Sequence, residues 1–180
     1  MPVSRDMMLA IVMSGLCTGT PQAVETATCM SFGPRLPTNQ AVQLLSALGE
    51  ALVSDMYTPN NLEAILKAIT KLAERDPVVA VTASFRGLVW GALAAARSNR
   101  THEGVVSGAC AFAVVVLRLQ RPLTYNMRAA LLELALVCTR DATWAPPSVD
   151  VASALLVLLK EFTSTTPGLD GTLTRLKICV

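Results

Sequence analysis

The segment from residue 77 to residue 119 constrains the fold of this chain more than any other part of the sequence. Between Pro77 and Ala96 the only charged residue is Arg86, and between Gly104 and Leu117 there is none. Stretches this apolar are typical of helices that are surrounded by other parts of a protein rather than by water. We therefore predict two long helices, over 77–96 and 104–117, that pack against each other as a central apolar hairpin.

Two features argue against a membrane-spanning role for this hairpin. The run from Gly104 to Leu117 is shorter than the roughly 20 residues that a spanning helix needs. The run from Pro77 to Ala96 is long enough, but Arg86 lies near its middle, where a charge is costly in a bilayer. Buried helices of a globular domain are favoured, and peripheral membrane contact is the less favoured alternative.

Helix-start signals and apolar periodicity predict further helices on both sides of the hairpin. Thr58-Pro59 and Asp76-Pro77 each place a capping residue before a proline at the first helical position. Apolar residues recur every three or four positions, as on one face of a helix. Further candidate N-caps are Thr38, Thr101, Thr124 and Ser148. The helices predicted outside the hairpin include those over residues 5–17, 21–32, 38–57, 125–139 and 149–162.

Together these signals predict an all-α fold of about eight antiparallel helices around, or including, the hairpin at 77–119. Leu88, Val114 and Leu131 are predicted core residues. A chain of 180 residues fits a single domain, 1–180, that can bury a sizeable core. Within it lie N-terminal helices and a loop (1–37), a helical core (38–163) and a C-terminal tail (164–180). A stack of helical hairpins and a compact bundle both fit this pattern.

The segment 61–88 resembles a HEAT or armadillo repeat. In such repeats a first amphipathic helix ends at Asp-Pro, and a second helix rich in Ala, Val and Leu follows. Asp76-Pro77 holds this position here, and the resemblance implies that Val79, Ala83 and Leu88 point inward. These repeats often carry a basic residue soon after the proline, where this chain has Val or Ala. The resemblance implies a stack of helical hairpins.

A second resemblance is to the Bcl-2-like bundles, in which amphipathic helices surround a central apolar hairpin. Leu45-Ser-Ala-Leu-Gly-Glu50 is similar to their Leu-x-x-x-Gly-Asp helix, and Phe85-Arg-Gly-Leu-Val-Trp-Gly91 is similar to their Asn-Trp-Gly-Arg turn. The asparagine is missing here, no arginine follows Gly91, and Trp90 falls in the middle of a predicted helix. The groove residues of that family are therefore not carried over to this chain.

The composition argues against a nucleic-acid-binding protein and favours a protein partner. Lys and Arg number 15 against 13 Asp and Glu, they are scattered, and aromatic residues make up 4% of the chain. Nucleic-acid interfaces need a basic surface and often aromatic side chains. The charged fraction of 16% is well below the usual ~25%. A surface this poor in charge predicts burial against a protein partner or by self-association.

The sequence predicts no catalytic residue, no cofactor site and no metal site. The single histidine, His102, precedes Glu103, and we expect this pair to cap a helix start rather than to act in proton transfer. No nucleotide-binding or hydrolase motif is present. The five cysteines have no C-x-x-C spacing, and Cys110 and Cys138 fall inside apolar helices. This usage indicates reduced thiols in an intracellular, cytoplasmic protein.

We therefore expect a non-enzymatic interaction or scaffold module that acts through an apolar helical surface. One alternative is a Bcl-2-like regulator of apoptosis that holds an amphipathic helix of its partner in a groove. Another is a self-assembling structural or coat-type subunit. We expect the interface on the helices at 38–57 and 149–162. The candidate interface residues are Leu45, Leu48, Leu52, Arg86, Trp90, Trp144, Leu156 and Val157.

Overall fold

A computed structural model describes residues 4–82, 85–119, 125–140 and 160. Its helices are α1 (Arg5–Cys17), α2 (Pro21–Phe32), α3 (Thr38–Leu52), α4 (Pro59–Arg75), α5 (Pro77–Thr82), α6 (Phe85–Ser98), α7 (Glu103–Leu119) and α8 (Tyr125–Arg140). These segments contain no strand, so the predicted all-α fold is confirmed. Candidate caps Thr124 and Ser148, nearly all of the predicted helix over 149–162, and the tail at 164–180 lie outside the described residues.

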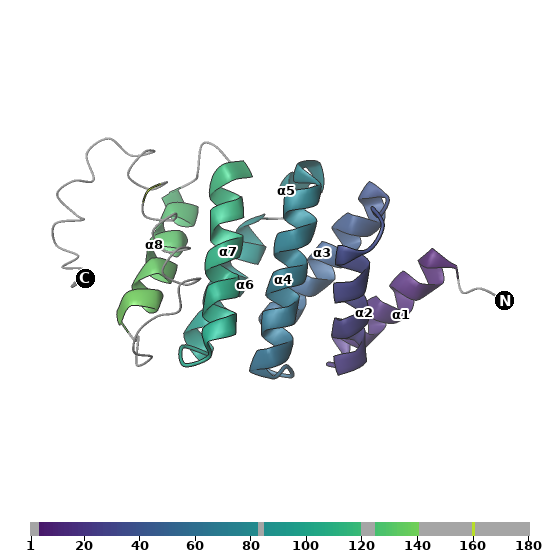
Figure 1. Ribbon diagram of the computed structural model, residues 1–180, viewed down its shortest axis with the longest axis horizontal. Coiled ribbons are helices and arrows are strands. Elements are labelled where there is room, and N and C mark those ends of the chain that lie inside the picture. Colours follow the sequence, from purple (N-terminus) through teal and green to yellow (C-terminus); the bar gives the residue numbers. More distant parts are fainter. Residues whose placement is uncertain (1–3, 83–84, 120–124, 141–159, 161–180) are drawn as a thin grey trace.

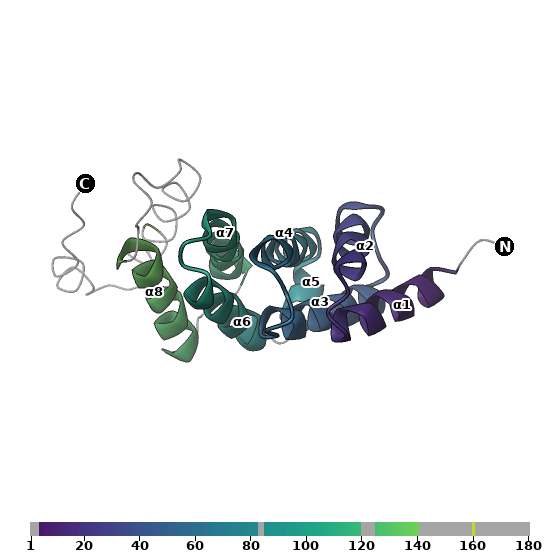
Figure 2. The same ribbon diagram turned by 90° about the horizontal axis from the view of Figure 1, so that it is seen from below.

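The helices form two layers, as Figures 1 and 2 show. One layer contains α2, α4 and α7, and the other contains α1, α3, α6 and α8. Neighbours within a layer contact each other, as α4 does with α2 and α7, and α3 does with α1 and α6. Successive helices also pack across the layers, as α3 does with α4 and α6 does with α7. The α6–α7 hairpin is therefore one member of a row of hairpins.

The helix predicted over 77–96 corresponds to α5 and α6, and residues 83 and 84 between them lie outside the described residues. α5 ends at Thr82, and α6 begins at Phe85. α5 is rich in β-branched residues, which lower helix propensity, and it packs mainly on α3 and α4, whereas α6 packs on α3, α7 and α8. The apolar run predicts helix on both sides of residues 83 and 84, but it does not show which neighbours each part of it meets. No helix in the described segments has the length and apolarity needed to cross a membrane.

The two predicted cap-then-proline starts are confirmed. Thr58 Oγ1 accepts a hydrogen bond from the Asn61 N–H at 3.4 Å, one turn into α4. Asp76 Oδ1 accepts one from the Val79 N–H, also at 3.4 Å, in the first turn of α5. Each side chain satisfies a backbone donor that has no partner within its own helix. These helix starts follow from local sequence alone.

Two other helix starts differ from the prediction. α3 begins at Thr38 itself, so Pro37 and not Thr38 occupies the N-cap position. α7 is capped by His102, whose Nδ1 accepts a hydrogen bond from the Val105 N–H at 3.4 Å. Thr101 is therefore not the cap of α7. The expectation that the histidine caps a helix is confirmed.

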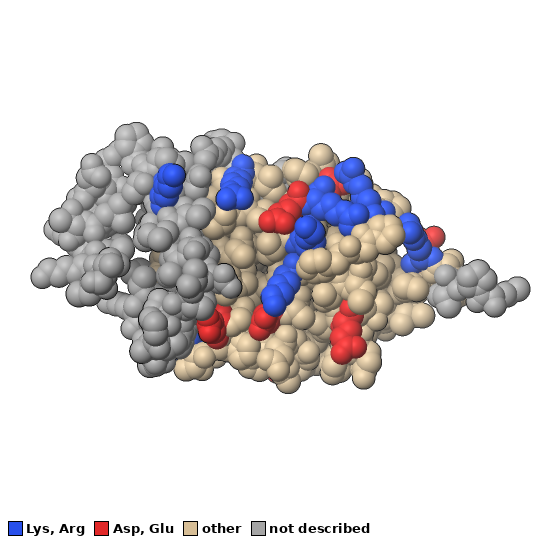
Figure 3. Space-filling view, in the orientation of Figure 1, with Lys and Arg blue, Asp and Glu red and all other residues tan. Residues whose placement is uncertain are grey.

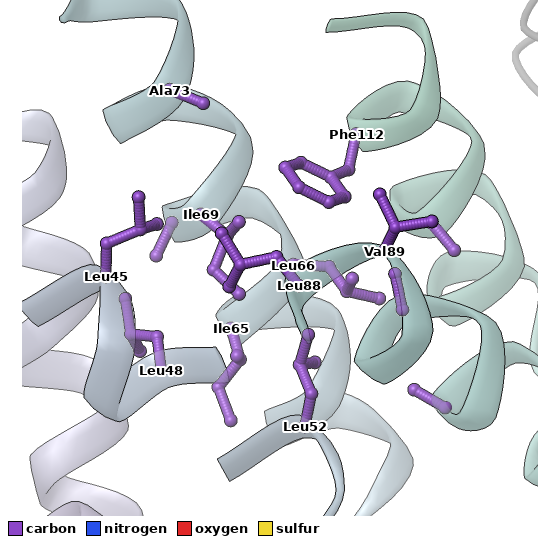
Figure 4. Close-up of a cluster of buried hydrophobic side chains, with 14 of the residues drawn as sticks. Leu45, Leu48, Leu52, Ile65, Leu66, Ile69, Ala73, Leu88, Val89 and Phe112 are labelled. Carbon is purple, nitrogen blue, oxygen red and sulfur yellow. The ribbon is translucent and has the colours of Figure 1, made fainter. Parts of the chain in front are cut away.

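The core lies between the two layers, where large apolar side chains of α3, α4, α6 and α7 meet (Figure 4). Phe112 is fully buried, and the predicted core residues Leu88, Val114 and Leu131 are buried too, which confirms that prediction. Cys110 is also buried in this core. Burying one large apolar side chain contributes about 1.5–3 kcal/mol, so this cluster is a major stabilising feature of the fold.

Glycines allow the helices of one layer to approach closely. A Cβ added at Gly49 of α3 would lie 2.6 Å from Leu88 Cδ2, and one added at Gly91 of α6 would lie 3.2 Å from Leu52 Cβ. In the other layer, a Cβ at Gly108 of α7 would lie 3.0 Å from a side chain of α4. The contact between α3 and α6 is therefore tight in the last turn of α3, which contains Gly49 and Leu52.

Candidate interaction groove

Three of the predicted interface residues lie in the core. Leu45, Leu48 and Leu52 of α3 are 0%, 0% and 3% exposed, because α1, α4 and α6 pack around this helix. The expectation that they contact a partner from an exposed helix face is therefore corrected: their side chains stabilise the fold of the chain itself. Leu52 alone has a second role, because it also lines the groove described below.

Trp90 is the predicted interface residue that reaches the surface. It is 40% exposed on α6. It lies one helical turn before Ala94, so the two residues share one side of the helix. Arg86 lies in the first turn of α6, and its side chain is outside the described part of the structure. Trp144, Leu156 and Val157 are outside the described residues altogether.

A groove opens where α3 ends. α3 stops at Leu52, earlier than the predicted end at 57, and the following loop leads into α4. The groove lies between this loop and the C-terminal end of α6, and its volume is about 330 Å³. The loops that join α3 to α4 and α6 to α7 both lie on the lower edge in Figure 1. The groove residues are Leu52, Val53, Ser54, Asp55, Tyr57, Leu62, Ala94, Ala95, Ser98 and Asn99.

The groove has an apolar floor and a polar rim. Leu52, Leu62 and Ala95 are buried and provide the floor. Asp55 and Ser98 are exposed and belong to the rim. Ligand sites in proteins combine the same two elements, an apolar concavity and a few polar groups, in volumes of roughly 300–1,000 Å³. The groove is at the small end of this range and suits one side chain or a short peptide segment.

Tyr57 holds the loop of the groove against α1. Its hydroxyl donates a hydrogen bond of 2.6 Å to the Leu16 carbonyl, near the C-terminal end of α1. Burial raises the pKa of the Tyr57 phenol, and the neighbouring Cys17 adds to this rise. The phenol therefore stays protonated at neutral pH and remains a donor within the fold. Tyr57 gives the groove a fixed wall.

Asp55 is the one charged residue among the groove residues in the described part of the chain. Its side chain is exposed, and it forms no hydrogen bond or ion pair within the segments that the structure describes. Asn99 donates through Nδ2 to the Ala95 carbonyl at 2.9 Å, which leaves its Oδ1 as a further acceptor beside the groove. The polar rim is therefore rich in acceptors and carries one negative charge.

His102 lies outside the groove, and both of its ring nitrogens are in use. Nδ1 accepts from the Val105 N–H, as described above, so Nε2 carries the proton and donates to Asn60 Oδ1 at 3.0 Å. The ring therefore fixes the α6–α7 loop to the start of α4. In the described segments, no three or more His, Cys, Asp or Glu side chains are placed to hold a metal ion.

A second charged surface lies on α4, and there the positive and negative side chains are more nearly balanced. Figure 3 shows Lys and Arg side chains running across the face where α4 lies, and Lys67, Lys71 and Arg75 recur at every fourth residue of this helix. Lys67 pairs with Glu63 at 2.6 Å, and Lys71 pairs with Glu74 at 3.9 Å. Because its lysines are matched by carboxylates, this surface is a weak candidate for a charged ligand.

Exposed apolar side chains gather at the N-terminal end of the row. Met7, Met8 and Ile11 of α1 are 58%, 39% and 62% exposed. This surface is apolar, whereas the groove at the end of α3 combines a concave shape with an unmatched charge. Comparisons of the chain with protein-family models, with curated proteins and with solved structures found no match.

Proposed function

We propose that this chain is a non-enzymatic interaction module that holds a segment of a partner protein in the groove between the α3–α4 loop and α6. The groove itself carries the proposal, because it combines a concave shape, apolar lining residues and a polar rim, as ligand sites in proteins do. Val53, which lines the groove and is 62% exposed, is the apolar surface that a partner would cover. The engagement of both His102 nitrogens in the fold supports a binding role over a catalytic one.

The two-layered row of helices also supports the proposal. HEAT and armadillo proteins stack helical hairpins, bury a continuous core between neighbours, and bind partners on the extended surface that results. The segment 61–88, which resembles such a repeat, forms most of α4, all of α5 and the start of α6. The Bcl-2-like alternative has less support, because it needs an apolar hairpin surrounded by other helices, whereas α6 and α7 take places in a row.

Selection of peptides on the purified chain tests this proposal. Ser98 is exposed at the end of α6 and lines the groove, so Ser98→Trp fills the groove without displacing a buried side chain. Ser46→Trp is the matched control, because Ser46 is an exposed serine of α3 that does not line the groove. We select peptides from a random 12-residue library on the unaltered chain and measure their dissociation constants by fluorescence anisotropy.

We expect the selected peptides to bind Ser98→Trp at least about tenfold more weakly, a difference of about 1.4 kcal/mol, and to bind Ser46→Trp as they bind the unaltered chain. Both variants should melt at the temperature of the unaltered chain, because both positions are exposed. A library that yields no binder, or binders that do not distinguish the two variants, would show that the groove is not a partner site.

A self-assembling subunit is the second candidate, and the exposed face of α1 is the observation that favours it. Exposed apolar surface is expected to be covered in the working state, and α1 presents Met7, Met8 and Ile11. Sedimentation equilibrium tests this candidate. We expect Ile11→Glu to weaken self-association, with Val53→Glu as the control on another exposed apolar position. A chain that is monomeric at 100 times the concentration used for peptide binding excludes this candidate.

A further inference from the structure

We infer that the groove selects a basic side chain, lysine or arginine, from the partner segment that occupies it. This inference rests on the proposed function and adds the chemistry of the occupant. Its first basis is charge. Asp55 is the ionised residue among the described groove residues, and no cation in the described part of the chain pairs with it. A partner cation would supply the missing charge.

The arginines closest in sequence to the groove residues are directed elsewhere. Arg97 forms an ion pair with Glu133 of α8. Arg100 Nε donates to the Arg97 carbonyl at 3.2 Å, in the last turn of α6. Neither arginine lines the groove. The two arginines beside Ser98 and Asn99 therefore do not balance the charge of Asp55.

The apolar lining of the groove suits the rest of a basic side chain. Lysine and arginine carry three or four methylene groups, which pack on apolar surface while the charged end stays near water. Exposed Val53 and half-buried Ala94, which line the groove above its buried floor, provide this apolar surface. At the rim, Asp55 and Asn99 Oδ1 provide acceptors for N–H donors, and a lysine ammonium has three such donors and no acceptor. An acidic side chain would meet the same rim with repulsion.

The helix ends around the groove add partial charges that leave its electrostatic potential negative. α3 and α6 both bring their C-terminal ends to the groove, where backbone carbonyls carry partial negative charge. α4 brings its N-terminal end, which carries partial positive charge, and contributes Leu62. Thr58 Oγ1 already accepts from one N–H of this end. Two negative ends against one positive end leave these partial charges negative on balance, which is the same sign as the full charge of Asp55.

Four forms of one peptide test the inference. The tightest peptide from the random library is made with lysine, arginine, norleucine or glutamate at its most affinity-sensitive position. Norleucine keeps the apolar stem of lysine and removes the charge. The variants are Asp55→Asn, which keeps the shape of the side chain, and Asp55→Lys, which reverses the charge. Glu50→Gln is the matched control, because Glu50 is an exposed carboxylate of α3 that does not line the groove.

On the unaltered chain and on Glu50→Gln we expect the lysine peptide to bind about tenfold more tightly than the norleucine peptide in low salt. Asp55→Asn should remove this difference and leave the affinity for the norleucine peptide unchanged. Asp55→Lys should favour the glutamate peptide. Exposed Asp55 stabilises no other group in the described fold, so all of these variants should melt as the unaltered chain does.

Three results would overturn the inference. The first is a lysine preference that persists in Asp55→Asn, and the second is a set of binding peptides without a basic residue. The third is displacement of the bound peptide by free n-butylammonium as effectively as by a lysine peptide, which would identify a small amine as the occupant. The inference and the proposed function fail separately. If Ser98→Trp weakens peptide binding and the Asp55 variants leave it unchanged, the groove remains a partner site and only its proposed charge selectivity is wrong.

Discussion

The two ends of α4 meet the rest of the chain in opposite ways, and an aspartate lies at each end. At the C-terminal end, Asp76 forms an ion pair with Arg35 at 2.6 Å and caps α5. The space left beside them is about 10 Å³, enough for about one water molecule. At the N-terminal end, Asp55 belongs to a groove of about 330 Å³ and has no partner in the described chain.

The charge of Asp76 is therefore part of an ion pair within the fold, whereas the charge of Asp55 is available to a ligand. Arg75, next to Asp76, donates to the carbonyls of Gly33 at 2.5 Å and Ser31 at 3.4 Å, so the end of α2 is attached to the end of α4. Polar groups at this closed junction are matched in pairs. At the open groove, Asp55 has no ion-pair partner in the described chain, which is the condition expected of a surface that completes its contacts with a ligand.

The largest effect should come from the closed junction. Leu72 lines it and is 5% exposed, so we expect Leu72→Ala to cost about 2–5 kcal/mol of the free energy of unfolding, because it leaves a cavity. Val53 at the groove is 62% exposed, and Val53→Ala should cost less than about 0.5 kcal/mol. Urea denaturation measures both. Equal losses would mean that the two ends of α4 do not differ in packing.

A bulky residue at Gly91 should connect the two properties of α6, tight packing and groove formation. A Cβ added at Gly91 would lie 3.2 Å from Leu52 Cβ, so the larger side chain of Gly91→Leu would overpack this contact. Overpacking of this kind costs about 1–3 kcal/mol of the free energy of unfolding. Gly87→Leu is the control on an exposed glycine of the same helix and should be neutral or slightly stabilising. Denaturation and peptide binding, measured together, show whether separation of α3 and α6 also disturbs the groove.

The two aspartates should respond differently to the same substitution. Asp76→Asn weakens the ion pair with Arg35 and the cap of α5, so we expect a lower melting temperature. Asp55→Asn should leave the melting temperature within experimental error, because its side chain makes no contact of this kind in the described chain. Calorimetry of the two variants decides the point. A loss at Asp55 as large as that at Asp76 would assign Asp55 a structural role.

The smallest effect is a pH dependence that belongs to Asp76. The hydrogen bond from Arg35 holds the pKa of Asp76 below its ordinary value. A carboxyl with a lowered pKa in the folded state contributes stability above its unfolded pKa, about 3.9, and loses it as the pH falls through the folded pKa. The difference in melting temperature between the unaltered chain and Asp76→Asn should therefore shrink below about pH 4. A difference that stays constant down to pH 2 would contradict this account.

Helix starts were predictable where one side chain decides them. Thr58 and Asp76 each reach a backbone N–H three residues ahead, so the signal lies within a few residues of sequence. The interface residues were not predictable in the same way. α3 is apolar on more than one side, as Leu45, Ala47 and Leu48 show, and the sequence does not reveal that neighbouring helices cover all of them.

The amino-acid sequence by itself determined that this chain is helical, and it determined which residues are apolar enough to form a core, because caps and periodicity act over one or two turns. The tertiary structure decided that α3 stops at Leu52, which neighbours α5 and α6 pack against, and that the groove exists. Asp55 and Ser98 are 43 positions apart and share one groove. Their meeting depends on how closely α3 and α6 pack along the row, and no local pattern in the sequence contains that distance.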